Sequence, residues 1–281
     1  MPPGQARKPT TPTTPTGSGS VPSAGSPAVP ASSPTSNVGG KRLHSLGTWL
    51  DNAEINAPGE AWMSLATAYW RSDSLREIDA PSIGLSVGVA PRVQFGVSLP
   101  YYHVTDRSGS SAHGFGASYL TSKIALGQGS RVRAATSPTL EILNWSSPEE
   151  GIQRVNWIIP VSIQADIAAA RTYVTGGYVS RGSVFGSGAV EWSAGSRLTL
   201  LVNVAHSYSV VDDPASDALG ISRHRTDAGA GAYITVTPSL VLFTNVGRTF
   251  APVNDTSSRL SVSAGIAVNV AGPATTSPRP P

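Results

Sequence analysis

Ser82–Tyr101 reads SIGLSVGVAPRVQFGVSLPY, and this stretch decides the fold. Apolar residues alternate with small or polar ones on both sides of Ala90-Pro91. Because successive side chains of a strand point to opposite faces, a period of two indicates β-structure. Pro91 fixes φ in a turn, so the two halves form a hairpin. The polar face carries mainly Gly and Ser, with Gln94 and Arg92. Such a face suits the wet, crowded interior of a barrel whose apolar face meets lipid.

Composition narrows the class of protein. The chain has 281 residues, and its charged fraction of 13% is half of the ~25% usual in soluble domains. No stretch approaches the ~18 apolar residues that a membrane-spanning helix needs. The absence of cysteine excludes disulfides and thiolate metal sites, and a net charge of +3 is too small to favour nucleic acid. Low charge without long apolar runs is typical of transmembrane β-barrels.

The two ends of the chain differ in amino-acid composition from its centre. Residues 1–40 are Pro, Thr, Ser and Gly, and we expect a disordered tail that is either a spacer or a partner-binding or wall-spanning arm. Residues 41–58 are predicted to be a lead-in or plug-like segment at the periplasmic mouth, and residues 271–281 a second disordered tail. The polar opening Met1-Pro2-Pro3-Gly4 has no signal-peptide character, so we expect the true start and export signal to be missing from this sequence.

Residues 59–270 are predicted to form the barrel. Twelve predicted strands cover about 60–71, 78–90, 92–103, 114–126, 131–144, 154–168, 171–180, 183–193, 197–210, 221–236, 240–250 and 259–270. Strands of this length exceed the ~5–6 residues usual in soluble proteins and suit a tilted membrane crossing. An even number of strands returns both ends of the barrel to the same side of the membrane.

The connections between these strands alternate in length. The short ones cover residues 90–91, 127–130, 169–170, 194–196 and 237–239. The intervening ones are longer and polar, at residues 105–113, 146–153, 211–220 and 251–258, with a short exception at 180–182. Bacterial outer-membrane barrels have short periplasmic turns and longer external loops. The sequence therefore predicts an all-β, antiparallel, up-and-down transmembrane barrel.

The segment Ala90–Tyr101 resembles part of a known family. Its turn, its Arg and its alternation ending in Ser-Leu-Pro-Tyr are similar to the outer-membrane barrel family named for the MetA pathway of phenol degradation. A Gly-rich stretch with a Lys follows in that family, as in Gly114–Gly116 and Lys123 here, although Ala117-Ser118 stands where the family has an Asp. The resemblance covers about residues 60–270. It implies an outer-membrane barrel that passes small, often apolar or aromatic, compounds.

Strand parity predicts that eleven charged side chains point into the barrel. They are Arg92, Lys123, Arg131, Arg133, Glu141, Asp166, Glu191, Arg223, Arg225, Asp227 and Arg259. A Lys or Arg on the lipid face near the midplane costs about 2–4 kcal/mol, so inward placement is expected. Two interpretations stay open. The charges either hydrate the lumen and pair across strands, or they form a constriction that selects solutes by charge.

Residues at the strand ends give further predictions. Arginines that start strands after short turns are expected to ring the periplasmic mouth, namely Arg92, Arg131, Arg171 and Arg197. Aromatic residues near strand ends are expected to form an interface belt; they are Trp62, Trp70, Tyr101, Tyr102, Trp145, Trp157, Tyr178, Trp192 and Tyr208. The spacing of Ser263, Gly265 and Val268 fits the last-strand signal that the barrel assembly machinery recognises, although Val270 replaces its usual aromatic residue.

The sequence favours a pore or small-molecule transporter with a polar lumen in the bacterial outer membrane. Its predicted partners are outer-membrane lipid, the barrel assembly machinery and small solutes, without nucleic acid or cofactor. No enzyme is predicted, because the five His residues show no metal-ligand spacing and no nucleophile pattern is evident. Two alternatives remain: a structural or adhesion barrel without transport, and a soluble β-sandwich binding module.

Overall fold

The structure is a computed structural model that describes residues 51–73, 75–142, 144, 154–180, 182–211, 223–251 and 257–272. Within them lie fourteen β-strands: β1 (Ala61–Arg71), β2 (Leu75–Ala90), β3 (Val93–Asp106), β4 (Ser111–Phe115), β5 (Ser118–Gln128), β6 (Val132–Thr136), β7 (Thr139–Ile142), β8 (Val155–Ile167), β9 (Ala170–Val179), β10 (Ser183–Ser193), β11 (Leu198–Ser209), β12 (His224–Thr237), β13 (Leu240–Ala251) and β14 (Leu260–Ala271). Among the described residues, no helix is long and apolar enough to cross a membrane. The predictions for residues 1–40 and 41–50, and for the tail after residue 272, lie outside this description.

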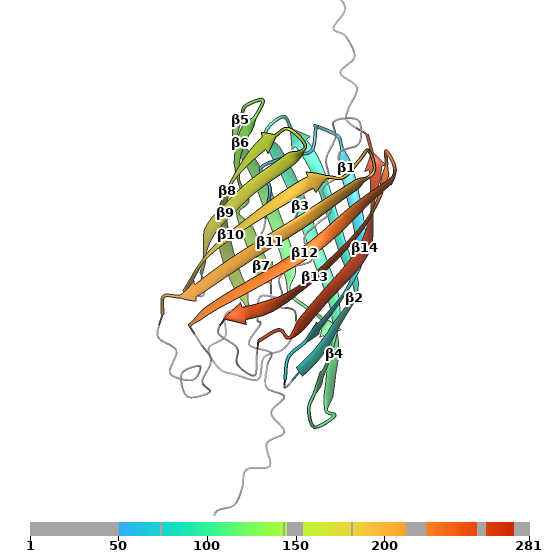
Figure 1. The fold of residues 1–281 in the computed structure, drawn as a ribbon. Helices are drawn as coiled ribbons and strands as arrows, with labels where there is room; N and C mark the ends of the chain where they lie inside the picture. The colour runs from blue at the N-terminus through green and yellow to red at the C-terminus, as the bar shows by residue number, and fades with distance from the viewer. Residues whose placement is uncertain are drawn as a thin grey trace, which may run out of the picture.

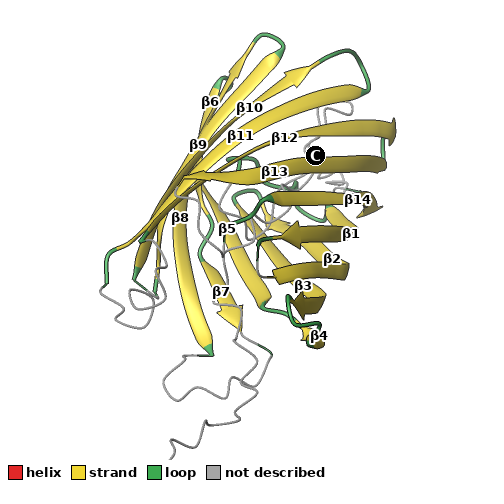
Figure 2. Ribbon diagram, turned by 60° about the horizontal axis from the view of Figure 1, so that its bottom comes forward, coloured by secondary structure: helices red, strands yellow, loops and turns green. Residues whose placement is uncertain are grey.

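The strands close into one antiparallel barrel (Figures 1 and 2). Strands that follow one another in sequence are paired, except β4 with β5 and β6 with β7, and β1 pairs with β14 from Ala61 to Arg71, which joins the two ends of the sheet. β4 and β5 both pair with β3 and make one crossing, and β6 and β7 both pair with β8 and make another. The barrel therefore has twelve crossings. The prediction of a twelve-stranded up-and-down barrel is confirmed, and the soluble β-sandwich alternative is wrong.

Two predicted strands are each divided in two by a local break. The strand predicted over 131–144 is interrupted at Ser137-Pro138, because Pro138 has no N–H to donate to the ladder. The strand predicted over 114–126 is interrupted at Gly116-Ala117, beside Pro100 of β3. Gly116 keeps one backbone hydrogen bond to the Pro100 carbonyl, at 2.8 Å. Both breaks thus occur where proline lies in or beside the ladder.

The barrel wall is apolar on its outer face and polar over part of its inner face, which is the reverse of a soluble protein. On β8, Val155, Ile163 and Ile167 are 50–63% exposed. The alternating residues Asn156 and Gln164 are fully buried inside the barrel. Apolar side chains cover the outside of most other strands in the same way. An exposed apolar surface of this extent marks a face that contacts lipid or another apolar partner.

An apolar cluster fills one side of the barrel interior. Trp62, Tyr173, Leu201, Tyr233 and Phe243 pack together there, and each is at most 6% exposed. The prediction of an interface belt is therefore wrong for Trp62, because the β1 register directs its side chain inward, opposite Ser86. Trp157 and Tyr178 do lie on the outer face of neighbouring strands, with ring centroids 5.5 Å apart. The apolar cluster leaves the other side of the interior to polar groups.

Candidate functional site: a charged network inside the barrel

Residues 51–60 lie inside the barrel against the polar side of the wall, and we call them the inner segment. Four of its side chains, those of Asp51, Asn52, Glu54 and Asn56, are at most 8% exposed. The segment approaches β2 so closely that a Cβ on Gly88 would overlap the carbonyl oxygens of Asn56 and Ala57. Only glycine fits at this position, because any side chain would displace the inner segment.

The backbone of the inner segment is held by amide side chains of the wall. Gln94 accepts a hydrogen bond from the Asn56 N–H at 2.8 Å, and Gln164 accepts one from the Ala53 N–H at 3.1 Å. The Asn56 side-chain amide donates to Ser86 at 3.0 Å. These bonds satisfy backbone groups that regular secondary structure leaves without partners. The wall and the inner segment are therefore complementary in hydrogen bonding.

A buried ion pair anchors the first residue of this segment. The Lys123 Nζ lies 2.7 Å from Oδ1 of Asp51, and the two side chains are 0% and 2% exposed. The Ser137 hydroxyl donates to the other carboxylate oxygen of Asp51. The Thr175 hydroxyl donates to the Asp51 carbonyl at 2.7 Å. Lys123 thus lies buried inside the barrel, and its partner lies before the first strand.

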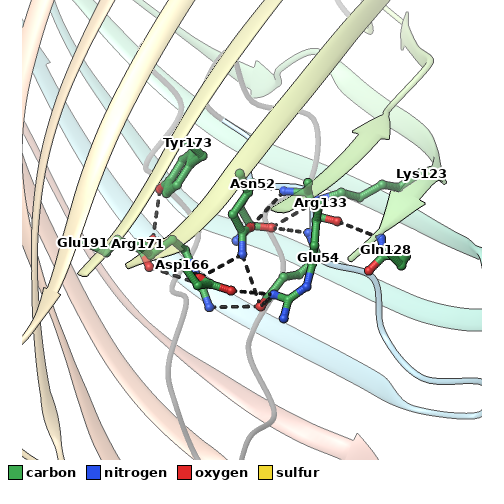
Figure 3. A network of polar contacts seen from close by, with 11 residues as sticks. Asn52, Glu54, Lys123, Gln128, Arg133, Asp166, Arg171, Tyr173 and Glu191 are labelled. Atoms are coloured by element: carbon green, nitrogen blue, oxygen red, sulfur yellow. Dashed lines mark hydrogen bonds and ion pairs between the residues drawn. The ribbon is translucent and has the colours of Figure 1, made fainter. Parts of the chain in front are cut away.

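A second set of charges surrounds Glu54 (Figure 3). Arg133 and Arg171 both contact its Oε1, Arg171 at 2.9 Å. Arg171 also contacts Asp166 at 3.1 Å and Glu191 at 3.4 Å. Glu191 in turn accepts a hydrogen bond from the Tyr173 hydroxyl at 3.0 Å. Arg171 therefore connects the inner segment to three consecutive strands of the wall.

Four of the eleven predicted lumen residues meet in this network: Lys123, Arg133, Asp166 and Glu191. Three more lie inside the barrel elsewhere. Glu141 accepts hydrogen bonds from Tyr119 at 3.2 Å and from Asn156 at 3.1 Å. Arg225 pairs with Asp227 at 2.8 Å, close to the longer connections.

The other four predicted residues lie in connections, outside the strands, and are exposed: Arg92, Arg131, Arg223 and Arg259. Because they lie outside the strands, strand parity does not fix the direction of their side chains, and their inward orientation stays a prediction. Arg259 contacts Asp73 through its Nε, at 3.0 and 3.1 Å, and joins the β1–β2 connection to the start of β14. The Arg259 guanidinium holds the pKa of Asp73 below its usual range, mainly by hydrogen bonding.

A polar trough lies on a part of the inner wall to which the inner segment makes none of the hydrogen bonds and ion pairs described above. Asn203, Gly229, Gly247, Ser261 and Trp70 stand side by side on five consecutive strands in register. The two glycines form its floor, and a cavity of about 10 Å³, enough for one water, lies above them. Within the described chain, Asn203 Nδ2 and Trp70 Nε1 are buried without a hydrogen-bond partner. They are available to water or to a polar solute.

A larger cavity lies at the break between β4 and β5. Its volume is about 540 Å³, and its lining includes Leu99, Tyr102, Phe115 and Asn144. Tyr102 stands opposite Gly114 in the β3–β4 register, and Phe115 is 56% exposed on the opposite face. The lining therefore combines residues of both faces of the wall. Its larger volume distinguishes it from the polar trough.

Sequence reasoning missed the two acidic residues of the inner segment. Asp51 and Glu54 precede the first strand and carry no periodic signal, so nothing local shows that they enter the barrel. Arg171 was expected at the periplasmic mouth, but it is 5% exposed inside the barrel. A signal existed in the wall itself, because inward Lys123, Arg133 and Gln164 need buried partners.

Two solved structures share this fold. The NanC porin has a TM-score of 0.54 at 9% identity, and the match covers 73% of this chain and 98% of that one. The KdgM porin has a TM-score of 0.50 at 8% identity, with the same two coverages. Likeness at this identity shows the fold of an outer-membrane barrel. No protein-family model and no curated protein matches the chain, so the resemblance to the phenol-degradation family stays a prediction.

Proposed function

We propose that the chain is a bacterial outer-membrane pore for small molecules, and that the inner segment closes it. The observation that carries this proposal is the way the segment is held. Its contacts with the wall are ion pairs and hydrogen bonds, which can be exchanged for water when the segment moves. The wall residues that it covers, Lys123, Gln94 and Gln164, are fully buried. Passage requires the segment to withdraw.

The solutes that this lumen favours are small and hydrophilic. Once the inner segment leaves, Lys123, Arg133, Asp166 and Glu191 face the opening and select by charge. The trough beside Asn203 adds unpaired donors. Apolar or aromatic compounds, which the family resemblance implies, find several aromatic groups together at the cavity beside Tyr102 and Phe115. We propose no enzymatic role for any of these groups. The similar folds named porins support a pore.

A structural or adhesion barrel is the second candidate. The packed interior favours it, because Tyr233 and Leu201 leave little free space on the apolar side. The β3–β4 hairpin also projects past the barrel at the end of the longer connections, where it is available for contact (Figure 1). In this case the inner segment is a permanent part of the fold, and no condition opens the barrel.

Single-channel conductance in planar bilayers separates the two candidates. The full chain is compared with a variant that lacks residues 1–58, and heat-dependent gel mobility checks that both are folded. A pore gives rare openings in the full chain and a steady conductance in the truncated one. A second variant carries Ala53→Cys and Gln164→Cys, which a bismaleimide joins, and this link abolishes the openings. Silence of the folded truncated barrel contradicts the pore and favours the structural role.

A further inference from the structure

The charged side chains on the outer face of the described strands are all arginines. Arg71, Arg76 and Arg248 point outward, each on the half of the barrel that bears the longer connections. The strand carboxylates lie inward or, for Asp106, bond within the β3–β4 turn. This outer surface therefore carries positive charge over the described strands.

Arg71 and Arg76 form a directly opposed pair. They face each other in the register of β1 and β2, and both side chains are exposed. Like charges at opposed positions of an antiparallel pair destabilise the sheet. Within the part of the chain described, neither guanidinium donates a hydrogen bond to a protein acceptor. The carboxylate of Asp73 lies within electrostatic range of Arg71, but its hydrogen bonds are made with Arg259.

The surroundings of the pair indicate which anion compensates it. Leu260 lies beside Arg71 on β14, and Tyr69 and Ile78 form the next outward row. Leu260 is 39% exposed and Ile78 is 44% exposed, so the arginines border the apolar belt. Charged groups at the edge of such a belt lie at the level of lipid headgroups. A soluble anion would gain nothing from this apolar border.

We propose that Arg71 and Arg76 bind the phosphate group of an anionic lipid in the leaflet that meets the longer connections. Each guanidinium offers a planar fork of donors that matches phosphate oxygens, and opposed strand positions bring the two forks together. The acyl chains of the same lipid then lie along Ile78, Leu260 and the rows below. The inference rests on the proposed membrane location, but it does not depend on whether the barrel conducts.

Native mass spectrometry of the folded full chain tests this site. The protein is loaded in mixed micelles of phosphatidylcholine and lipid A, and the retained lipid A is counted. We expect Arg71→Gln with Arg76→Gln to lower retention about tenfold, which corresponds to about 1.4 kcal/mol, because both charged donors to the lipid phosphate are removed. The lysine pair Arg71→Lys with Arg76→Lys retains an intermediate amount. The matched control, Arg92→Gln with Arg131→Gln at the opposite end, retains as much as the wild type.

Three outcomes would overturn the proposal. Equal retention by the glutamine pair and the wild type excludes the site. Equal loss in the control pair shows an effect of net charge alone. Displacement of lipid A by inorganic phosphate at equal concentration shows a site for a soluble anion. Conductance of the glutamine pair is measured in parallel and stays at the wild-type level whether or not the lipid site exists. Failure of the lipid proposal is therefore distinguished from failure of the pore proposal.

Discussion

The ammonium group of Lys123 lies 2.7 Å from the carboxylate of Asp51, and both are sealed from water inside the barrel. Seventy-two positions separate them in sequence. Charges removed from water in this way are stable only as a pair, because the desolvation of each is offset by the other. This ion pair therefore fastens the inner segment to β5 of the barrel wall.

We expect Lys123→Met to release the inner segment. The substitution leaves the Asp51 carboxylate buried without its cation, which costs about 3–5 kcal/mol. Because the chain has no natural cysteine, Ala53→Cys is a clean reporter, and its side chain is fully buried in the closed barrel. Thiol labelling of Ala53→Cys by a water-soluble maleimide should become fast in the Lys123→Met background.

The compensating variant Asp51→Asn with Lys123→Met is the control for this prediction. It removes both charges, so labelling at position 53 should return most of the way to the slow rate. If labelling is equally fast in the single and double variants, the ion pair does not hold the segment, and the amide contacts of Gln94 and Gln164 do so instead.

Gly88→Ala should open the barrel without any change of charge. The new Cβ would overlap the carbonyl oxygens of Asn56 and Ala57, so the inner segment must shift away from β2. The expected result is faster labelling of Ala53→Cys and more frequent conductance events. Gly127→Ala is the matched control, because a Cβ there meets no atom within 4 Å. A Gly88→Ala barrel that labels as slowly as the Gly127→Ala barrel contradicts the close approach.

The alternation of side chains predicted the wall of the barrel, because it is a local property of each strand. Inward Asn156 and outward Val155 follow directly from it. Alternation fails where the register shifts. Carried back from Ser82, it places Ile78 inside, but a bulge between Asp79 and Ser82 turns Ile78 outward. Sequence parity has no means to detect such a bulge, so the outward Arg76 was not predicted.

The interior was harder to predict than the wall. Arg171 and Glu54 are 117 residues apart in sequence, and their contact exists only after the barrel has closed around the inner segment. No period or motif connects a short polar stretch to a partner at that separation. The sequence does indicate that a partner is required, because a charge such as that of Lys123 on an inward face must be compensated. The identity of the partner depends on the whole fold.

The pair of Asp73 and Arg259 should survive moderate acid. The Arg259 guanidinium lowers the pKa of Asp73 in the folded barrel, so the contribution of this pair is complete above the ordinary pKa of aspartate. It is lost only as the pH falls through the lowered folded value. A pH titration of the Asp73 carboxyl by NMR in detergent should show the low midpoint in the wild type and an ordinary one in Arg259→Gln. Equal midpoints in the two proteins would contradict the contact.

The cost in folding free energy of an arginine on the outer face should depend on the depth of that arginine in the membrane. Val202 is 63% exposed at the middle of β11, where an arginine costs about 2–4 kcal/mol if lipid surrounds it. Val210, just beyond the end of β11, is 50% exposed, and an arginine there should cost less than about 1 kcal/mol. Unfolding by urea from lipid vesicles measures both. A Val202→Arg barrel as stable as Val210→Arg would mean that water, and not lipid, covers this face.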